Sequence, residues 1–105
     1  MNADYVKNLL TFMKAKGWKL EKATDQHYVM APPAYVEAAP DFRLLLAHEK
    51  FVETPDYEEN MYAMTKNMSK LYEVDYLLLI NLFSKSLPEL KAYNQVTGEM
   101  LGVAV

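Results

Sequence analysis

The hydrophobic positions between Thr54 and Phe83 form the longest periodic pattern in the chain. Large apolar side chains recur there at alternating spacings of four and three residues, the repeat of one face of an α-helix, at Tyr57, Met61, Met64, Met68 and Leu71. Thr54 suits a helix cap and Pro55 the first helical position. The pattern predicts a long helix whose methionine-rich face either packs in the core or offers an adaptable surface to another protein.

A second apolar segment follows after a short polar break at residues 73–75. Asp75 suits a helix cap, and the stretch from Tyr76 to Ser84 is apolar almost all round. A continuous apolar run also fits a buried strand, but leucine dominates this one and β-branched residues are scarce, so we expect a short helix. Within that helix we expect Leu79 to be buried.

Residues 68–83 have the outline of a DNA-binding helix-turn-helix, in which the segment after Asp75 would be the recognition helix. A recognition helix needs polar or basic side chains that reach base edges and phosphates. This segment offers Tyr76, three leucines and Ile80 instead, and Glu73 stands where a turn glycine is usual. The residue types therefore favour two packed helices, and DNA binding is kept only as an alternative.

The first half of the chain predicts one helix and three strands. Apolar positions recur with the helical period in residues 3–16, Asn2 or Asp4 is a candidate cap, and Gly17 suits the position after the helix end. The loop at residues 32–40 contains three prolines, which disfavour both helix and central strand. The predicted strands are residues 18–21, 27–31 and 41–47, the first two forming a hairpin.

Together these elements predict a single α+β domain of order α-β-β-β-α-α-(β), with the helices packed on one face of a small antiparallel sheet. Trp18, the only tryptophan, is expected to anchor the sheet against the first helix. We expect this domain to span residues 1–105, with residues 95–105 forming either an edge strand or a tail. The bracketed element is the apolar and uncharged segment 100–105. Because an unpaired apolar edge attracts another strand, we expect a homodimer built through this segment or through the long helix.

The composition narrows the chemistry further. The 105 residues carry a formal net charge of −3 and no cysteine, which excludes disulfides and thiolate metal sites and disfavours binding to nucleic acid or anionic membranes. The longest apolar run, residues 76–80, is far shorter than the roughly 20 residues that span a bilayer, so we expect a cytoplasmic protein. No phosphate loop, nucleophile elbow or HExxH motif occurs, and His27 and His48 lack metal-site spacing. We therefore expect no cofactor, no metal and no enzyme activity.

These observations favour a small non-enzymatic protein-interaction module that regulates or inhibits another protein, of the kind that a phage or mobile element encodes. Tyrosine and methionine are enriched where proteins meet, and the chain has eight tyrosines and seven methionines. The candidate contact residues are Tyr35, Val36, Tyr57, Tyr62, Met100, Leu101 and Val103. Two alternatives stay open: a helix-turn-helix-like DNA-binding regulator, and a small ligand-binding or enzyme domain with a buried polar pocket.

Overall fold

The computed structural model describes residues 1–85 and has the predicted α+β order, α-β-β-β-α-α. The element predicted at residues 100–105 lies outside the described residues. The elements are α1 (Asp4–Ala15), β1 (Lys19–Ala23), β2 (His27–Ala31), β3 (Leu44–Ala47), a one-turn 3-10 helix η1 (Glu49–Phe51), α2 (Pro55–Tyr72) and α3 (Tyr76–Phe83).

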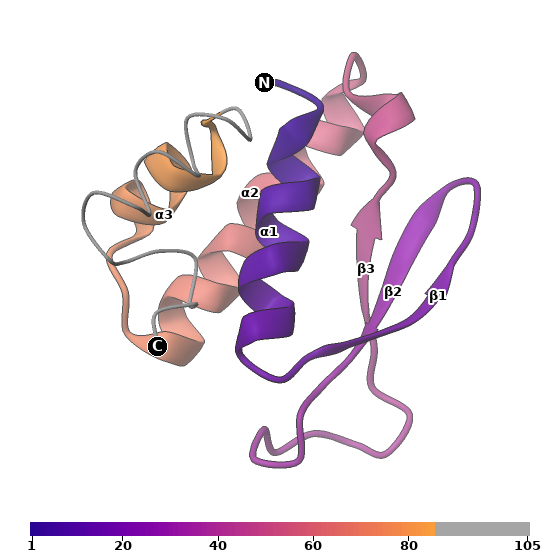
Figure 1. Cartoon of the computed structure of the whole chain (residues 1–105), viewed down its shortest axis with the longest axis vertical. Coiled ribbons are helices and arrows are strands. Elements are labelled where there is room, and N and C mark those ends of the chain that lie inside the picture. The colour runs from indigo at the N-terminus through magenta and orange to yellow at the C-terminus, as the bar shows by residue number, and fades with distance from the viewer. Residues whose placement is uncertain (86–105) are drawn as a thin grey trace.

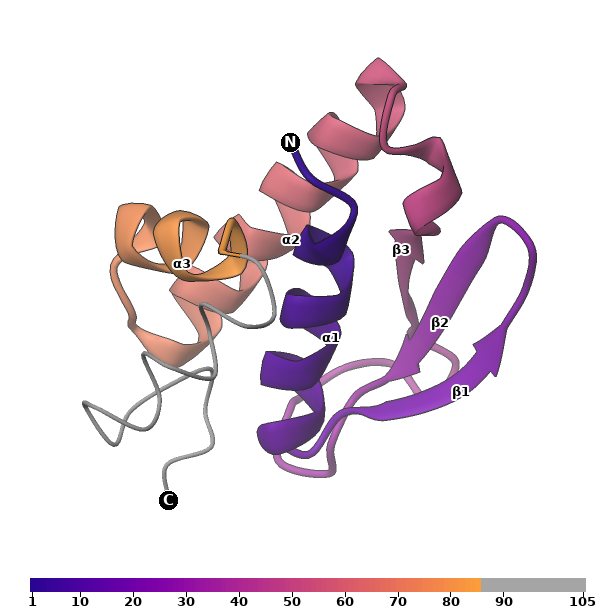
Figure 2. The ribbon, with the colours of Figure 1, turned by 45° about the horizontal axis from the view of Figure 1, so that its top comes forward.

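The elements form three layers (Figures 1 and 2). The antiparallel sheet has the strand order β1-β2-β3, and α1 and α2 cover one of its faces. Our prediction that every helix packs on the sheet is wrong for α3, which packs mainly against α1 and α2 on their side away from the strands. The physical reason is that a helix that is apolar almost all round needs partners on several sides. Phe83 of α3 meets Tyr5 and Phe12 of α1 edge to face, with ring centroids 5.7 and 5.6 Å apart.

Capping side chains explain where α2 and α3 begin. The Thr54 hydroxyl accepts the backbone N–H of Tyr57 at 3.2 Å, and the Asp75 carboxylate accepts that of Leu78 at 2.9 Å, as predicted. At α1 the prediction is wrong, because no side chain caps the helix. The side chain of Asn2 instead reaches α3 and donates to the Ser84 carbonyl at 2.7 Å.

The buried face of α2 departs from the predicted stripe at its end. Tyr57, Met61 and Met68 are buried as expected, but Leu71 is 41% exposed. Thr65, which is not part of the predicted stripe, is buried. A spacing of four and three averages 3.5 residues, whereas a straight helix has 3.6 residues per turn, so such a stripe drifts around the helix by about 20° per heptad. After two heptads the drift has turned Leu71 away from the core.

Strand β3 is shorter than the predicted strand at residues 41–47. The register pairs Met30 with Leu44, so two steps further along the ladder Pro32 would stand opposite Phe42 and then Pro33 opposite Asp41. Proline has no backbone N–H to donate, and the pairing therefore cannot continue. The chain turns instead, with the N–H of Phe42 donating to the Ala39 carbonyl at 2.9 Å.

Both edges of the sheet are modified in ways that oppose further strand pairing. At the β3 edge, the Asn60 side chain of α2 accepts the N–H of Ala47 at 2.8 Å and donates to the Leu45 carbonyl at 3.0 Å. At the β1 edge, the register shifts between Leu20 and Lys22, and charged residues populate the strand. Occupied backbone groups, irregular register and edge lysines are known protections of sheet edges. Among the described residues, we therefore expect a contact surface to be formed by side chains and not by backbone pairing at a sheet edge.

Candidate interaction surface

The sequence-predicted contact residues fall into three environments. Tyr35 is 60% exposed, Tyr62 is 36% exposed and Val36 is partly buried. Tyr57 is fully buried, so its nomination as a surface contact was wrong. Its hydroxyl accepts the N–H of Val6 at 3.2 Å and lies 3.4 Å from the Asn2 carbonyl, which makes it a link between α2 and α1. The remaining three candidates, Met100, Leu101 and Val103, lie outside the described residues.

The exposed candidates are not brought together. Tyr62 borders a hollow at the start of α2 that is also lined by Val52, Pro55 and Glu58. Tyr35 and Val36 belong to the proline-rich loop, which lies at the other end of the molecule, the lower end in Figure 1. The structure thus defines two separate surfaces, of which only the second is strongly apolar.

A chain of hydrogen bonds fixes the proline-rich loop to the helices. The Tyr35 hydroxyl donates to the Lys16 carbonyl at 2.5 Å, so its oxygen is left to accept from the Tyr72 hydroxyl, also at 2.5 Å. The Tyr72 oxygen in turn accepts the indole N–H of Trp18 at 3.0 Å. Burial and the hydrogen bond to Tyr35 raise the pKa of Tyr72 to about 12, so this chain stays protonated and intact at neutral pH.

Close packing at Gly17 brings the same loop against the end of α1. Gly17 has a φ of +100°, a backbone conformation that residues other than glycine rarely adopt. A Cβ at this position would lie 3.2 Å from Cβ of Pro33 and 3.8 Å from the Tyr35 ring. The glycine therefore serves both the helix end and the approach of the loop, and the loop is held in place from two sides.

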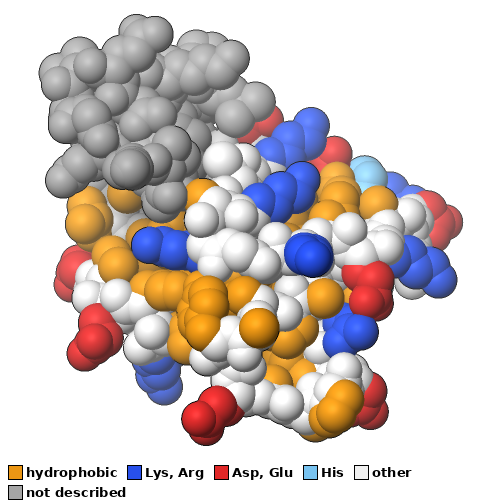
Figure 3. Space-filling model, turned by 60° about the horizontal axis from the view of Figure 1, so that its bottom comes forward, with side chains coloured by type: hydrophobic (Ala, Val, Ile, Leu, Met, Phe, Trp, Pro, Cys, Tyr) orange, Lys and Arg blue, Asp and Glu red, His pale blue; other side chains and the backbone are white. Residues whose placement is uncertain are grey.

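An apolar groove of about 350 Å³ lies beside this loop. Trp18 and Met68 are buried and form its floor, whereas Phe42 and Leu71 are 39% and 41% exposed and stand at its rim. The full lining comprises Trp18, Val36, Phe42, Leu44, Asn67, Met68 and Leu71. Figure 3, which turns this end of the molecule forward, shows hydrophobic side chains gathered in the middle of the face with charged ones around them.

The groove has one polar side chain in its lining, the amide of Asn67, and no charged one. Such a surface suits an apolar group and offers a single hydrogen-bonding position to orient it. Sequence analysis identified Val36 but missed Phe42 and Leu71, which it assigned to a strand and to the core. The sequence contained one signal for the position of Phe42, the prolines at 32 and 33. They end the pairing between β2 and β3, so Phe42 lies outside the strand.

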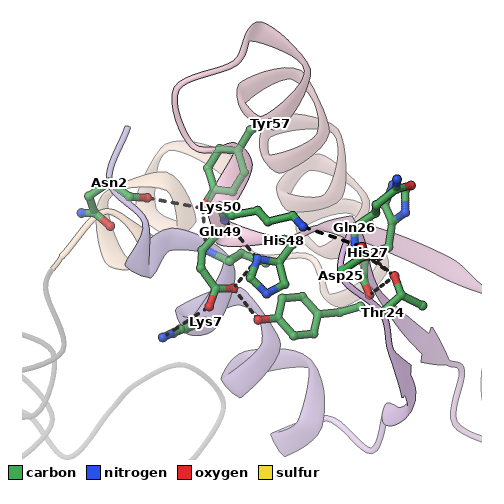
Figure 4. Close-up of polar contacts among 12 residues, drawn as sticks. Asn2, Lys7, Thr24, Asp25, Gln26, His27, His48, Glu49, Lys50 and Tyr57 are labelled. Carbon is green, nitrogen blue, oxygen red and sulfur yellow. Dashed lines mark hydrogen bonds and ion pairs between the residues drawn. The ribbon is translucent and has the colours of Figure 1, made fainter.

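A polar cluster joins α1, β2 and η1 on another side of the molecule (Figure 4). The Tyr28 hydroxyl donates to the Glu49 carboxylate, and the Lys7 ammonium lies 3.6 Å from the other carboxylate oxygen. His48 stacks on the Tyr28 ring at 5.4 Å between centroids. Its Nδ1 accepts the backbone N–H of Lys50 at 3.0 Å and lies 3.6 Å from a carboxylate oxygen of Glu49.

The protonation chemistry of this cluster suits a structural link between β2, η1 and α1. Burial and the hydrogen bond to Glu49 raise the pKa of Tyr28 to about 12, which makes it a weaker acid than an ordinary tyrosine and leaves even less nucleophilic tyrosinate at neutral pH. Burial alone would raise the pKa of Glu49, but the Tyr28 hydroxyl, the backbone N–H, His48 and Lys7 together hold it below its usual value. Glu49 is therefore a poor proton acceptor. Among residues 1–85, no group of three or more histidine, aspartate or glutamate side chains is placed to hold a metal ion.

The α2–α3 corner gives no support to the DNA-binding alternative. Glu73 adopts the left-handed conformation, with φ 54° and ψ 46°, at the position where the sequence lacked a glycine. The outward positions of α3 include Leu77, 70% exposed, and Leu78, 44% exposed. No lysine or arginine lies in α3 itself. Among the exposed side chains of α3, which are Leu77, Leu78 and Asn81, only the Asn81 amide can pair with a base edge or a phosphate.

Comparison of the chain with protein-family models, with curated proteins and with solved structures found no match. Across residues 1–85, no helix combines the length and the apolar character needed to cross a membrane.

Proposed function

We propose that this chain is a small non-enzymatic protein-interaction module that regulates or inhibits another protein, and that the groove lined by Trp18, Phe42 and Leu71 is its contact surface. The observation that carries the proposal is an apolar groove with no charged side chain in its lining, beside a loop that hydrogen bonds hold against α1 and α2. Exposed apolar surface is costly for a monomer, and where it is contiguous it often marks a site of contact.

The groove fits a short segment of another protein that inserts one or two bulky apolar side chains. Its volume of about 350 Å³ lies near the lower end of the range for small-molecule sites, and its open, aliphatic and aromatic walls offer dispersion contact rather than directional bonds. The Asn67 amide at its border can pair with a backbone group of such a segment. Because Tyr35, Tyr72 and Gly17 fix one wall, little ordering is needed on binding, which favours affinity.

Trp18 provides a direct assay, because it is the only tryptophan and lies in the groove. Peptides that bind the immobilised full-length protein are selected from a displayed library. Selected peptides without tryptophan are then titrated into the protein while the fluorescence emission of Trp18 is measured. We expect the selected peptides to share a large apolar residue and to change the Trp18 emission on binding. Selected peptides that leave the emission unchanged would place the contact elsewhere and overturn the proposal.

A pair of leucine variants distinguishes binding in the groove from nonspecific hydrophobic binding. Leu71→Lys places a charge at the rim of the groove, and Leu77→Lys makes the same change on the exposed face of α3. Both sites are solvent-exposed, so circular dichroism should show an unchanged fold. Binding of the selected peptides should weaken about tenfold or more for Leu71→Lys and stay unchanged for Leu77→Lys. Equal loss in both variants would contradict a specific groove.

The regulatory part of the proposal needs the partner itself. Proteins that the wild type retains from an extract of the host, and that Leu71→Lys does not, are purified and assayed for their own activity. We expect saturating amounts of the wild-type chain, and not of Leu71→Lys, to change that activity. If the partner binds through the groove and its activity does not change, the chain is an interaction module without a regulatory role.

A further inference from the structure

The exposed side of α2 carries an ordered arrangement of charge around one small residue. Asp56, Glu59, Ala63, Lys66 and Lys70 are all exposed, and they follow one another at spacings of three, four, three and four residues. Those spacings place them on a single stripe of the helix, opposite the buried Tyr57, Met61 and Met68. Counted from Ala63, the carboxylates stand four and seven residues before it and the lysines three and seven residues after it.

The stripe has no charged partner in the described part of the chain. The ion pairs of residues 1–85 link Lys7 with Glu49, Arg43 with Glu21 and Lys50 with Asp25, and leave out all four charges of the stripe. An acidic start and a basic end also suit the helix dipole, which accounts for the signs of the charges. The dipole does not account for their nearly symmetric placement about an exposed alanine.

We propose that this stripe is a self-association surface, on which α2 pairs antiparallel with α2 of a second copy about a two-fold axis at Ala63. In that arrangement Glu59 faces Lys66 of the second copy and Asp56 faces Lys70 of the second copy, and symmetry repeats both pairs. A parallel pairing would set like charges against each other, so the pattern selects the antiparallel one. A closed two-fold pair is also the commonest form of soluble oligomer.

Steric and apolar features of the stripe fit close approach of two helices. A small side chain on the axis allows the helices to reach the roughly 8–10 Å separation of packed pairs. Tyr62, 36% exposed, lies at the margin of the stripe, three residues after Glu59 and four before Lys66, and supplies aromatic contact area there. Since both sheet edges are protected, the helix face is the more open route to a dimer. Exposed ion pairs contribute little each, so we expect the dimer to be weak and to dissociate as salt is added.

Charge reversals test the pairing in both directions. Sedimentation equilibrium of the full-length chain at low salt is compared with that of Glu59→Lys and Lys66→Glu. Each reversal turns two attractive pairs into repulsive ones and should raise the dimer dissociation constant about tenfold. A mixture of the two variants should form a heterodimer, because positions 59 and 66 are both positive in one variant and both negative in the other. The variant that carries both changes should dimerise like the wild type.

Two further variants sharpen the result. Lys22→Glu makes the same charge change on β1, away from α2, and should leave the dimer intact. Ala63→Arg keeps a good helix former but puts bulk on the axis, and should yield a monomer at concentrations where the wild type dimerises. A wild-type chain that is monomeric at low salt and high concentration overturns the proposal. So does a dimer that ignores Ala63→Arg and both reversals, since its contact must lie elsewhere.

Discussion

Leu77 and Leu79 lie two residues apart in α3 and have opposite environments. Leu79 is 1% exposed in the core, as the sequence predicted, whereas Leu77 is 70% exposed. Leu79→Ala should lower the free energy of unfolding by about 2–5 kcal/mol, because it removes buried methyl groups and leaves a cavity. Leu77→Ala should change it by less than about 0.5 kcal/mol. Urea denaturation of both variants checks this, and an unchanged midpoint for Leu79→Ala would contradict the packing of α3.

Asn8 is a buried polar side chain in the middle of an apolar helix face. Its amide nitrogen donates to the carbonyls of Phe83 at 3.0 Å and Lys85 at 2.7 Å, so it closes the end of α3 onto α1. Asn8→Ala should destabilise the protein by about 1–3 kcal/mol, because two carbonyls lose a buried donor. Thr11→Ala, on the exposed side of the same helix, should cost well under 1 kcal/mol. Equal midpoints for the two variants in urea would show that the Asn8 bonds add nothing.

The environment of Asn8 also marks the limit of prediction for single side chains. The helical period placed residues 3–16 in a helix with one apolar face, but an asparagine on that face gave no sign of its role. Its hydrogen-bond acceptors are 75 and 77 residues away in the chain. Long-range polar pairings of this kind have no local pattern, since they depend on how two elements come to lie against each other.

Helices and strands were predicted well where local chemistry decides their limits. Thr54, Asp75 and Gly17 marked helix ends correctly, because caps and glycine turns act within a few residues. Errors arose where a second element decides, as for β3, whose start depends on the prolines that follow β2. The packing of α3 on helices rather than on the sheet likewise follows from tertiary contacts.

The corner between α2 and α3 contains a residue in an unfavourable conformation. Glu73 has a positive φ of 54°, which costs a residue with a Cβ about 1–2 kcal/mol and costs glycine almost nothing. Glu73→Gly should therefore raise the free energy of unfolding by about 0.5–1 kcal/mol, after allowance for the greater freedom of glycine in the unfolded chain. Glu73→Ala is the control and should bring no gain. A loss of stability in Glu73→Gly, measured by urea denaturation, would contradict this account of the corner.

Asn60 substitutes for a neighbouring strand at the edge of β3. Asn60→Ala should expose the N–H of Ala47 and the carbonyl of Leu45 and destabilise the protein by about 1–2 kcal/mol. Hydrogen exchange provides the specific readout, because the Ala47 amide should exchange faster while the Val29 amide in the middle strand stays protected. Asn67→Ala, on the same helix but without a bond to the sheet, is the matched control. Uniform acceleration across β2 and β3 would instead indicate general unfolding.

The candidate site could be predicted only in part, because the groove is assembled from distant segments. Its lining comes from residue 18, from residues 36–44 and from residues 67–71. Periodicity can assign a side chain to a buried or exposed face, but it cannot show that two half-buried faces leave a hollow between them. Tyr35 and Val36 were identified because prolines flank them. Tyr57 was misassigned because a tyrosine on an apolar stripe fits a core as well as a contact.

Glu49 connects two layers of the protein, the sheet and α1, and its titration should affect the stability of the protein as a whole. Glu49 in η1 binds Tyr28 of the sheet and faces Lys7 of α1. Burial disfavours its charged form, but the Tyr28 hydroxyl, the backbone N–H, His48 and Lys7 outweigh that effect and lower its pKa from the ordinary 4.5. A carboxylate with a lowered pKa in the folded state stabilises the fold above its unfolded pKa, and this stabilisation is lost as the pH falls through the folded value.

Glu49→Gln tests this linkage, because it keeps the shape of the side chain and removes the charge. At pH 7 the variant should be less stable than the wild type by about 1 kcal/mol, since a charge-assisted hydrogen bond becomes a neutral one and the Lys7 contact is lost. The difference should persist down to about pH 5 and shrink as the pH falls below 4.5, the unshifted pKa of Glu49. Urea denaturation at pH 7, 5, 4 and 3 measures it, with Glu37→Gln in the exposed loop as a control that should show no such trend. A difference that stays constant down to pH 3 would mean that the charge of Glu49 does not hold the sheet, α1 and η1 together.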